Sequence, residues 1–373
     1  MKDLNFLPNH ILSPGQAHLG ALALTLSYVG SLYLTKPGTT RRQSRTSSPE
    51  RTDESAALGD IISQDEYAEQ MLGGSGQFEE QLHRDHPVVI KSRIRAVSAA
   101  TIIGCVGVGA VVGRFLNDSR QLWTYKSVIN ATSTLLGFTP PSASSIISRQ
   151  FLLAVILPPL LFIGPLYTTY LDKALPFQQF GKASLGLGSS TRNDGMLDCL
   201  RVFWTRAGDE KELVQRMNSR NLQQRRWVEL RNCVAGPVSE EIVFRSCIIA
   251  IYQLAGFSTP FIVFVSPLWF GVAHLHHAYD VFVKGGRTRQ AAIQATVTSL
   301  FQLTYTTLFG WFAAHLFTKT GSIWPPMVAH VFCNMMGFPN PSYTLQENPG
   351  HKGRVWLAYG LGIAAFTLGL RKM

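Results

Sequence analysis

Charged residues are scarce in this sequence. They make up 15% of the 373 residues, whereas apolar residues make up 46% and the mean hydropathy is positive. The charges are also segregated, because long stretches carry none while others are crowded with Arg, Lys, Asp and Glu. A charge in the middle of a bilayer costs roughly 3 kcal/mol on insertion scales. The scarcity and the segregation therefore argue against ordinary soluble domains and favour a protein that crosses the membrane several times.

Closely spaced cysteines and the HExxH motif of zinc proteases are missing as well. The five cysteines are scattered without a CxxC pair, at Cys105, Cys199, Cys233, Cys247 and Cys333. Three of them lie in apolar runs, where small thiols are usually packing residues. This pattern argues against a thiolate metal site and against a catalytic cysteine.

Acidic residues are fewer than basic ones, which gives a formal net charge of +11. The basic residues flank apolar runs and do not form one patch with interleaved aromatic residues, so we expect no nucleic-acid partner. Arg and Lys beside membrane spans fix topology and contact anionic lipid headgroups, which explains the excess.

Apolar runs long enough for membrane helices are the main positive signal. We expect an all-α, polytopic membrane protein with about eight transmembrane helices that enclose an intramembrane polar cavity. The candidate spans are residues 17–35, 96–113, 151–171, 233–255, 259–274, 293–317, 323–337 and 355–370. The first span lacks a basic region before it and a small-residue cleavage site after it, which favours a retained helix over a signal peptide.

The spans and the polar segments between them divide the chain into six parts. These are an N-terminal transmembrane helix (1–35), a disordered cytosolic loop (36–87), transmembrane helices with their connections (88–205), a basic amphipathic cytosolic helix (206–232), a catalytic transmembrane core (233–339) and a C-terminal transmembrane helix with its tail (340–373). The loop is predicted from its Ser, Thr, Arg, Gly and Glu content, which cannot form a core.

Positive charge predicts the orientation of the chain. A lumenal N-terminus puts the basic clusters beside the first, second, fourth and fifth spans in the cytosol. The glycosylation sequons at Asn117 and Asn130 then face the lumen. Arg371 and Lys372 do not follow this scheme, so the sequence does not determine the topology of the last span.

Two adjacent glutamates lie in the fourth span. Glu241 and Arg245 are four residues apart, so they can pair on one helix face as a structural ion pair. Glu240 lies about 100° around the helix from Glu241 and has no local counter-charge. An intramembrane carboxylate of this kind is a candidate functional group, here a general base.

A histidine ends the fifth span. Phe270 and His274 are four residues apart, so the phenyl ring can pack under the imidazole and fix its direction. His277 lies on the same face and is expected to support His274. His276 is interpreted as an ordinary residue of the membrane boundary.

The seventh span carries His330 and Asn334 on one face of an apolar helix. Two polar side chains in this setting need partners. Both can donate hydrogen bonds, and two donors aimed at one point suit an oxyanion. The alternative interpretation is a polar contact that holds two helices together.

These residues form three motifs in order, Glu240-Glu241-x-x-x-Arg245, Phe270-x-x-x-His274 and His330-x-x-x-Asn334. Together they resemble the motifs of the type II CAAX prenyl protease family, part of the CAAX protease and bacteriocin-processing superfamily. The flanking residues are similar to those of the eukaryotic Ras-converting endopeptidases over 227–339, and loosely over 84–97. Residues 36–76 depart from the pattern and look like an insertion.

The resemblance implies a protease of the endoplasmic reticulum membrane with an active site open to the cytosol. It would remove the aaX tripeptide from prenylated CAAX proteins such as Ras-like small GTPases. Glu240 and His274 would activate a water molecule without a covalent intermediate, and His330 and Asn334 would stabilise the oxyanion. No cofactor is expected.

Two alternatives remain at this point. Glu240, His274 and His330 could ligate zinc as two histidines and one carboxylate, although HExxH is absent. A chain of another class, a non-catalytic scaffold or a transporter with a polar ion relay, would also keep polar residues in the membrane. No inverted repeat or pair of broken helices points to a transporter.

Overall fold

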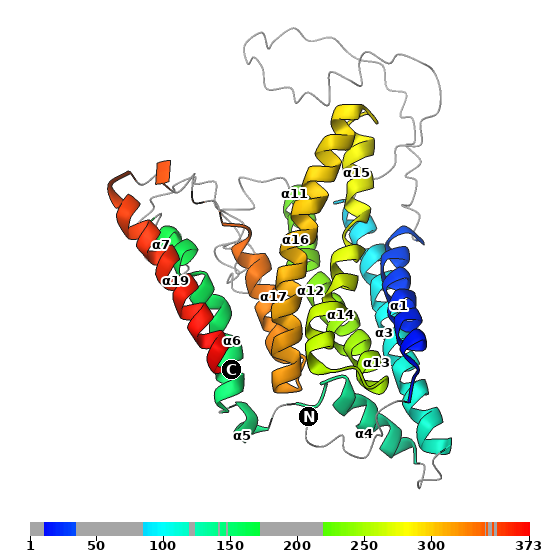
Figure 1. Ribbon diagram of the computed structural model, residues 1–373. Helices are drawn as coiled ribbons and strands as arrows, with labels where there is room; N and C mark the ends of the chain where they lie inside the picture. Colours follow the sequence, from blue (N-terminus) through cyan, green and yellow to red (C-terminus); the bar gives the residue numbers. More distant parts are fainter. Residues whose placement is uncertain are drawn as a thin grey trace, which may run out of the picture.

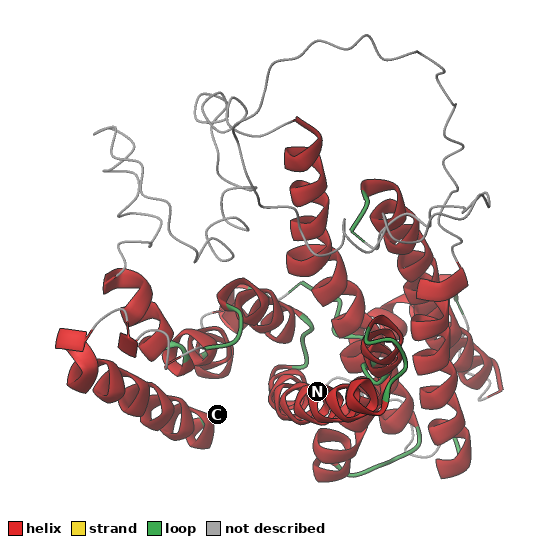
Figure 2. Ribbon diagram, turned by 90° about the horizontal axis from the view of Figure 1, so that it is seen from above, coloured by secondary structure: helices red, strands yellow, loops and turns green. Residues whose placement is uncertain are grey.

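The computed structural model describes residues 11–34, 85–118, 124–140, 142–146, 148–171, 219–339, 341, 345–346 and 349–373. Within these ranges the chain is helical and contains no β-strand, which confirms the all-α class (Figure 2). The helices are α1 (Pro14–Leu34), α3 (Pro87–Asp118), α4 (Tyr125–Leu135), α5 (Ala143–Ile146), α6 (Arg149–Leu161), α7 (Ile163–Leu171), α11 (Ser219–Leu230), η2 (Arg231–Ala235), α12 (Gly236–Glu241), η3 (Ile242–Cys247), α13 (Ile248–Leu254), α14 (Thr259–Ala273), α15 (His276–Lys284), α16 (Arg289–Thr320), α17 (Trp324–Met336), η4 (Pro349–His351) and α19 (Lys352–Lys372).

Four helical stretches in the described part of the chain are long and apolar enough to cross a membrane: Pro14–Leu34, Pro87–Asn117, Thr259–Lys284 and Pro349–Lys372. A fifth span is added if α6 and α7, which are bent by 53° relative to each other, are counted as one. The chain is thus a multi-pass membrane protein. Residues 233–255, 293–317 and 323–337 are largely helical but do not meet the same criterion, so the count of eight stays a prediction.

The bend between α6 and α7 has a local cause. Pro165 has no N–H to donate to the carbonyl of Leu161, and its ring crowds that carbonyl, so the helix breaks at this turn. α19 packs closely here, because a Cβ atom on Gly362 would lie 2.9 Å from the carbonyl oxygen of Leu160 and 3.2 Å from that of Leu161. The two halves of the broken helix and α19 therefore form one packed layer at the side of the bundle (Figure 1).

The long helices run in alternating directions through the bundle (Figure 1). One end of the bundle contains α15 and the first turns of α3 and α16. The basic residues of 91–95, in α3, and of 284–289, between α15 and α16, lie at this end. The opposite end contains α4, which carries Asn130, and the C-terminus of α19, which carries Arg371 and Lys372. The basic residues of 91–95 and 284–289 therefore share one end, whereas Arg371 and Lys372 lie at the other.

Of the six predicted parts, only 233–339 is described throughout, and the other five fall partly outside the described residues. The predicted loop 36–87 is described only from residue 85 onward, and the predicted basic helix 206–232 only from residue 219 onward, as α11 and the start of η2. This helix is attached to the start of α3. Arg231 forms an ion pair with Asp85 at 2.7 Å, and the ammonium of Lys91 lies 4.6 Å from the ring centroid of Trp227.

The segment from η2 to α13 lies at the centre of the bundle. Every side chain from 243 to 250 is buried, and α1, α3, α14 and α17 pack around the segment. η2 and η3 are π-helical, a wider turn that is often found at functional sites. Because this segment carries the two adjacent glutamates, their carboxylates are held inside the bundle.

The contact between α14 and α16 depends on a glycine. A Cβ atom on Gly310 would lie 2.6 Å from the Cβ atom of Pro267, which is part of a rigid ring. We expect Gly310→Ala to lower the free energy of unfolding by about 1–3 kcal/mol, the usual cost of overpacking. Gly107→Ala on α3 is the matched control, because open space surrounds it and alanine favours the helix by about 0.5–1 kcal/mol. Thermal unfolding in detergent compares them, and equal stability of the two variants would contradict this packing.

Candidate active site

The two adjacent glutamates have different surroundings. Glu241 is fully buried, and its Oε1 lies 3.0 Å from Nη1 of Arg245, so the predicted ion pair is present. The side chain of Glu240 is 21% exposed and lines a cavity, whereas neither Glu241 nor Arg245 lines it. The offset around the helix thus directs one carboxylate inward and the other toward open space.

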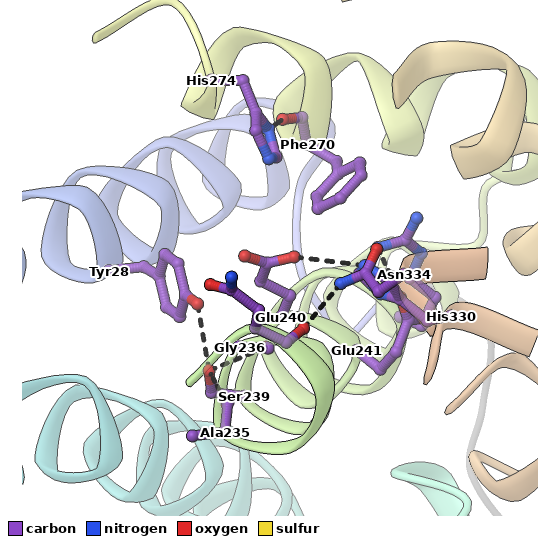
Figure 3. Close-up of polar contacts among 12 residues, drawn as sticks. Tyr28, Ala235, Gly236, Ser239, Glu240, Glu241, Phe270, His274, His330 and Asn334 are labelled. Carbon is purple, nitrogen blue, oxygen red and sulfur yellow. Dashed lines mark hydrogen bonds and ion pairs between the residues drawn. The ribbon is translucent and has the colours of Figure 1, made fainter. Parts of the chain in front are cut away.

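His330, at the middle of α17, lies between these two carboxylates (Figure 3). Its Nδ1 is 2.7 Å from Oε1 of Glu241, and its Nε2 is 3.6 Å from Oε2 of Glu240. The contact between His330 and Glu241 was not predicted. The two residues are 89 positions apart, so no spacing rule for a single helix could have indicated it.

Asn334 lies one turn beyond His330 on α17. Its side-chain amide donates a hydrogen bond of 2.8 Å to the main-chain carbonyl of Asn232 in η2. This is a polar contact between two helices, the alternative that the sequence left open for this pair. Both His330 and Asn334 also line the cavity, and the Asn334 amide has a second hydrogen that this bond does not use.

His274 ends α14 on the other side of the same space (Figure 3). Its Nδ1 lies 2.7 Å from the carbonyl oxygen of Phe270, and the two rings meet edge to face with centroids 4.6 Å apart. The predicted packing of Phe270 against His274 is therefore confirmed. No hydrogen bond joins His274 to Glu240, His330 or Asn334, all of which are described. The ring of His277 lies 6.2 Å from that of His274.

One cavity of about 1760 Å³ connects these groups. Its lining is mostly apolar and includes the four predicted catalytic residues Glu240, His274, His330 and Asn334, together with His277. Tyr28, from α1, also lines it, and its hydroxyl lies 3.0 Å from Oγ of Ser239. Tyr28 was not predicted, because a tyrosine within an apolar run carries no sequence signal for a distant partner.

The cavity is larger than the usual range for small-molecule sites, about 300–1,000 Å³. An apolar cavity with a few convergent polar groups suits a ligand that is mostly hydrophobic and carries one reactive polar part. Within the described ranges, no three His, Cys, Asp or Glu side chains are placed so that they could hold one metal ion.

Comparisons with known proteins point to one family. A family model described as type II CAAX prenyl endopeptidase Rce1-like matches residues 223–336, a stretch that contains all four predicted catalytic residues. The CAAX prenyl protease 2 of Homo sapiens is 30% identical over 338 residues, which cover 88% of this chain and 88% of the human protein.

Two further relatives match over shorter stretches. The probable CAAX prenyl protease 2 of Schizosaccharomyces pombe is 42% identical over 131 residues, 35% of this chain and 46% of the yeast protein. The CAAX prenyl protease 2 of Arabidopsis thaliana is 38% identical over 138 residues, 37% of this chain and 42% of the plant protein. These two alignments span less than half of the relatives' own lengths. No solved structure matches the chain.

Proposed function

Because the chain belongs to the type II CAAX prenyl protease family and is therefore a peptidase, we propose that it removes the C-terminal aaX tripeptide from prenylated CAAX proteins. The observation that carries the proposal is the position of Glu240. Its carboxylate lines a large, mostly apolar cavity inside a membrane protein, beside the imidazole of His330.

Glu240 is the general base in this proposal. It takes a proton from a water molecule that His274, across the cavity, orients toward the substrate. The water oxygen attacks the carbonyl carbon of the prenylated cysteine, and the carbonyl oxygen becomes an oxyanion. When the C–N bond breaks, Glu240 returns the proton to the leaving nitrogen. The products are a prenylcysteine carboxylate and a free tripeptide, without a covalent enzyme intermediate.

His330 and Asn334 receive the oxyanion. A well-placed donor of this kind contributes about 2.7–4 kcal/mol to the stability of the transition state. The side-chain amide of Asn334 is held by the carbonyl of Asn232, which fixes its direction. Its second hydrogen is the one assigned to the oxyanion.

The apolar part of the cavity receives the prenyl chain. Residues of α6, α7 and α19 line it, including Leu161, Pro165, Ile363 and Phe366. Burial of the chain contributes about 0.8 kcal/mol per CH₂ group, which explains why an unprenylated peptide should be a poor substrate. We place the enzyme in the endoplasmic reticulum membrane. The end that carries the basic residues of 91–95 and 284–289, and the opening of the cavity, face the cytosol in this proposal. The substrates there are Ras-like GTPases.

The direct test is cleavage by the purified protein in detergent or lipid. We expect a prenylated CAAX peptide to lose its aaX tripeptide, measured by mass spectrometry, while the same peptide without the prenyl group is cleaved much more slowly. Activity should persist in a strong chelator. Loss of activity that added Zn²⁺ restores would instead favour a metal-dependent hydrolase, and binding without any cleavage would favour a scaffold or transporter.

A further inference from the structure

Glu241 is fully buried, outside the cavity, and in contact with a residue that lines it. Its Oε1 lies 3.0 Å from Nη1 of Arg245 and 2.7 Å from Nδ1 of His330. We propose that Glu241 is a positioning residue for catalysis, which holds His330 so that Nδ1–H points to the carboxylate and Nε2–H points into the cavity. This inference rests on the proposed function, because it concerns how His330 comes to serve as an oxyanion donor.

The chemistry of the contact restricts the protons of His330. An ionised carboxylate only accepts hydrogen bonds, so the Nδ1 atom beside Glu241 must carry a hydrogen. If His330 were neutral, Nε2 would then have a lone pair and could not donate to an oxyanion. His330 therefore acts as a donor only with both nitrogens protonated. The negative charge of Glu241, 2.7 Å away, offsets the positive charge that this requires.

The surroundings keep the carboxylate of Glu241 in place. The side chain of Arg245 is only 1% exposed, and its guanidinium carbon lies 4.2 Å from the ring centroid of Phe270 and 5.5 Å from that of Phe309. The ring of Phe309 also packs on His330, with centroids 4.8 Å apart. These aromatic rings exclude water from both charge contacts, and contacts between charges are stronger where water is excluded.

The Nε2 atom of His330 has a different environment. It lies 3.6 Å from Oε2 of Glu240, which is too long for a direct hydrogen bond. The structure therefore separates the two carboxylates by role. Glu241 is bonded to His330, whereas Glu240 is beside it and exposed to the cavity, where it can act on water.

The test must distinguish positioning from a purely structural role. Removing Glu241 alone would leave Arg245 buried and unpaired, so the first variant replaces both, as Glu241→Leu with Arg245→Met. Replacing a whole buried ion pair by apolar side chains of similar size is often neutral for stability. We expect this variant to fold, to keep its KM within about twofold, and to lose kcat by about 10²- to 10³-fold, the effect of losing one oxyanion donor.

A second variant and a mutant cycle complete the experiment. Glu241→Gln keeps an acceptor for Nδ1–H but lacks the charge, so it should recover part of the kcat that the leucine variant loses.

His330→Ala combined with the double variant should be little slower than His330→Ala alone, because residues that act through one another are not additive. Ser246→Ala is the matched control: Ser246 is fully buried, does not line the cavity, and donates 2.7 Å to the carbonyl of Leu136. Any loss of kcat that Ser246→Ala causes should multiply with the loss that His330→Ala causes.

Two results would overturn the inference. One is a folded Glu241→Leu, Arg245→Met protein with the kcat of the unmutated enzyme. The other is a triple variant, with His330→Ala added to the double variant, whose kcat falls below that of His330→Ala by the full factor that the double variant shows alone. Both can occur while the unmutated protein cleaves prenylated peptides normally, so they are distinguishable from failure of the proposed function, which would show as no cleavage at all.

Discussion

Glu240→Gln is expected to lower kcat for a prenylated CAAX peptide by about 10²- to 10⁴-fold, the usual contribution of a general base. Glutamine has nearly the same shape as glutamate but cannot take a proton from water. Because the side chain lines the cavity and forms no direct hydrogen bond with His330, its replacement should disturb neither the fold nor substrate binding. KM should therefore change little.

The measurement is the rate of tripeptide release over a range of substrate concentrations, with protein shown to be folded by gel filtration. Glu229→Gln is the matched control, because it makes the same chemical change on α11 at a side chain that does not line the cavity. Full activity in a folded Glu240→Gln protein would exclude Glu240 as the base.

Arg245→Met is expected to have the largest effect on stability. It leaves the carboxylate of Glu241, which has no exposed surface, in contact with His330 but without its guanidinium partner. Breaking a buried ion pair by removing one partner usually costs about 3–5 kcal/mol, because an uncompensated charge stays buried. The methionine also replaces a guanidinium that packs on Phe270.

Unfolding in detergent, followed by circular dichroism as the temperature rises, measures this loss. Addition of Glu241→Leu to Arg245→Met should restore most of the stability, because no buried charge then remains. If Arg245→Met alone is as stable as the unmutated protein, the ion pair does not stabilise the bundle in the way its burial indicates.

Local sequence patterns predicted the contacts within single helices. The pairing of Glu241 with Arg245 and the packing of Phe270 under His274 both join residues four apart, and helix geometry alone makes such residues neighbours. The same geometry separated Glu240 from Glu241. The apolar composition likewise predicted the all-helical class and the multi-pass membrane protein.

The number of spans was harder to predict. α6 and α7 were taken together as a single span over residues 151–171, and the structure bends them by 53° at a break caused by proline. Of the other predicted spans, α17 has only 13 residues and 233–255 is divided among η2, α12, η3 and α13, so both are too short to count as single spanning helices. α16 is long enough, but it is rich in threonine and does not pass the hydropathy criterion. Apolar content alone is a weak guide where a helix is covered by neighbouring helices instead of lipid.

The sequence by itself determined which side chains are polar within the apolar helices, and which of them share a helix face. Only the tertiary structure decided how the helices bring them together. The contacts of His330 with Glu241, of Asn334 with Asn232 and of Tyr28 with Ser239 join residues 89, 102 and 211 positions apart. The physical reason is that helix spacing fixes neighbours within about one turn, whereas contacts between helices depend on how the whole bundle packs.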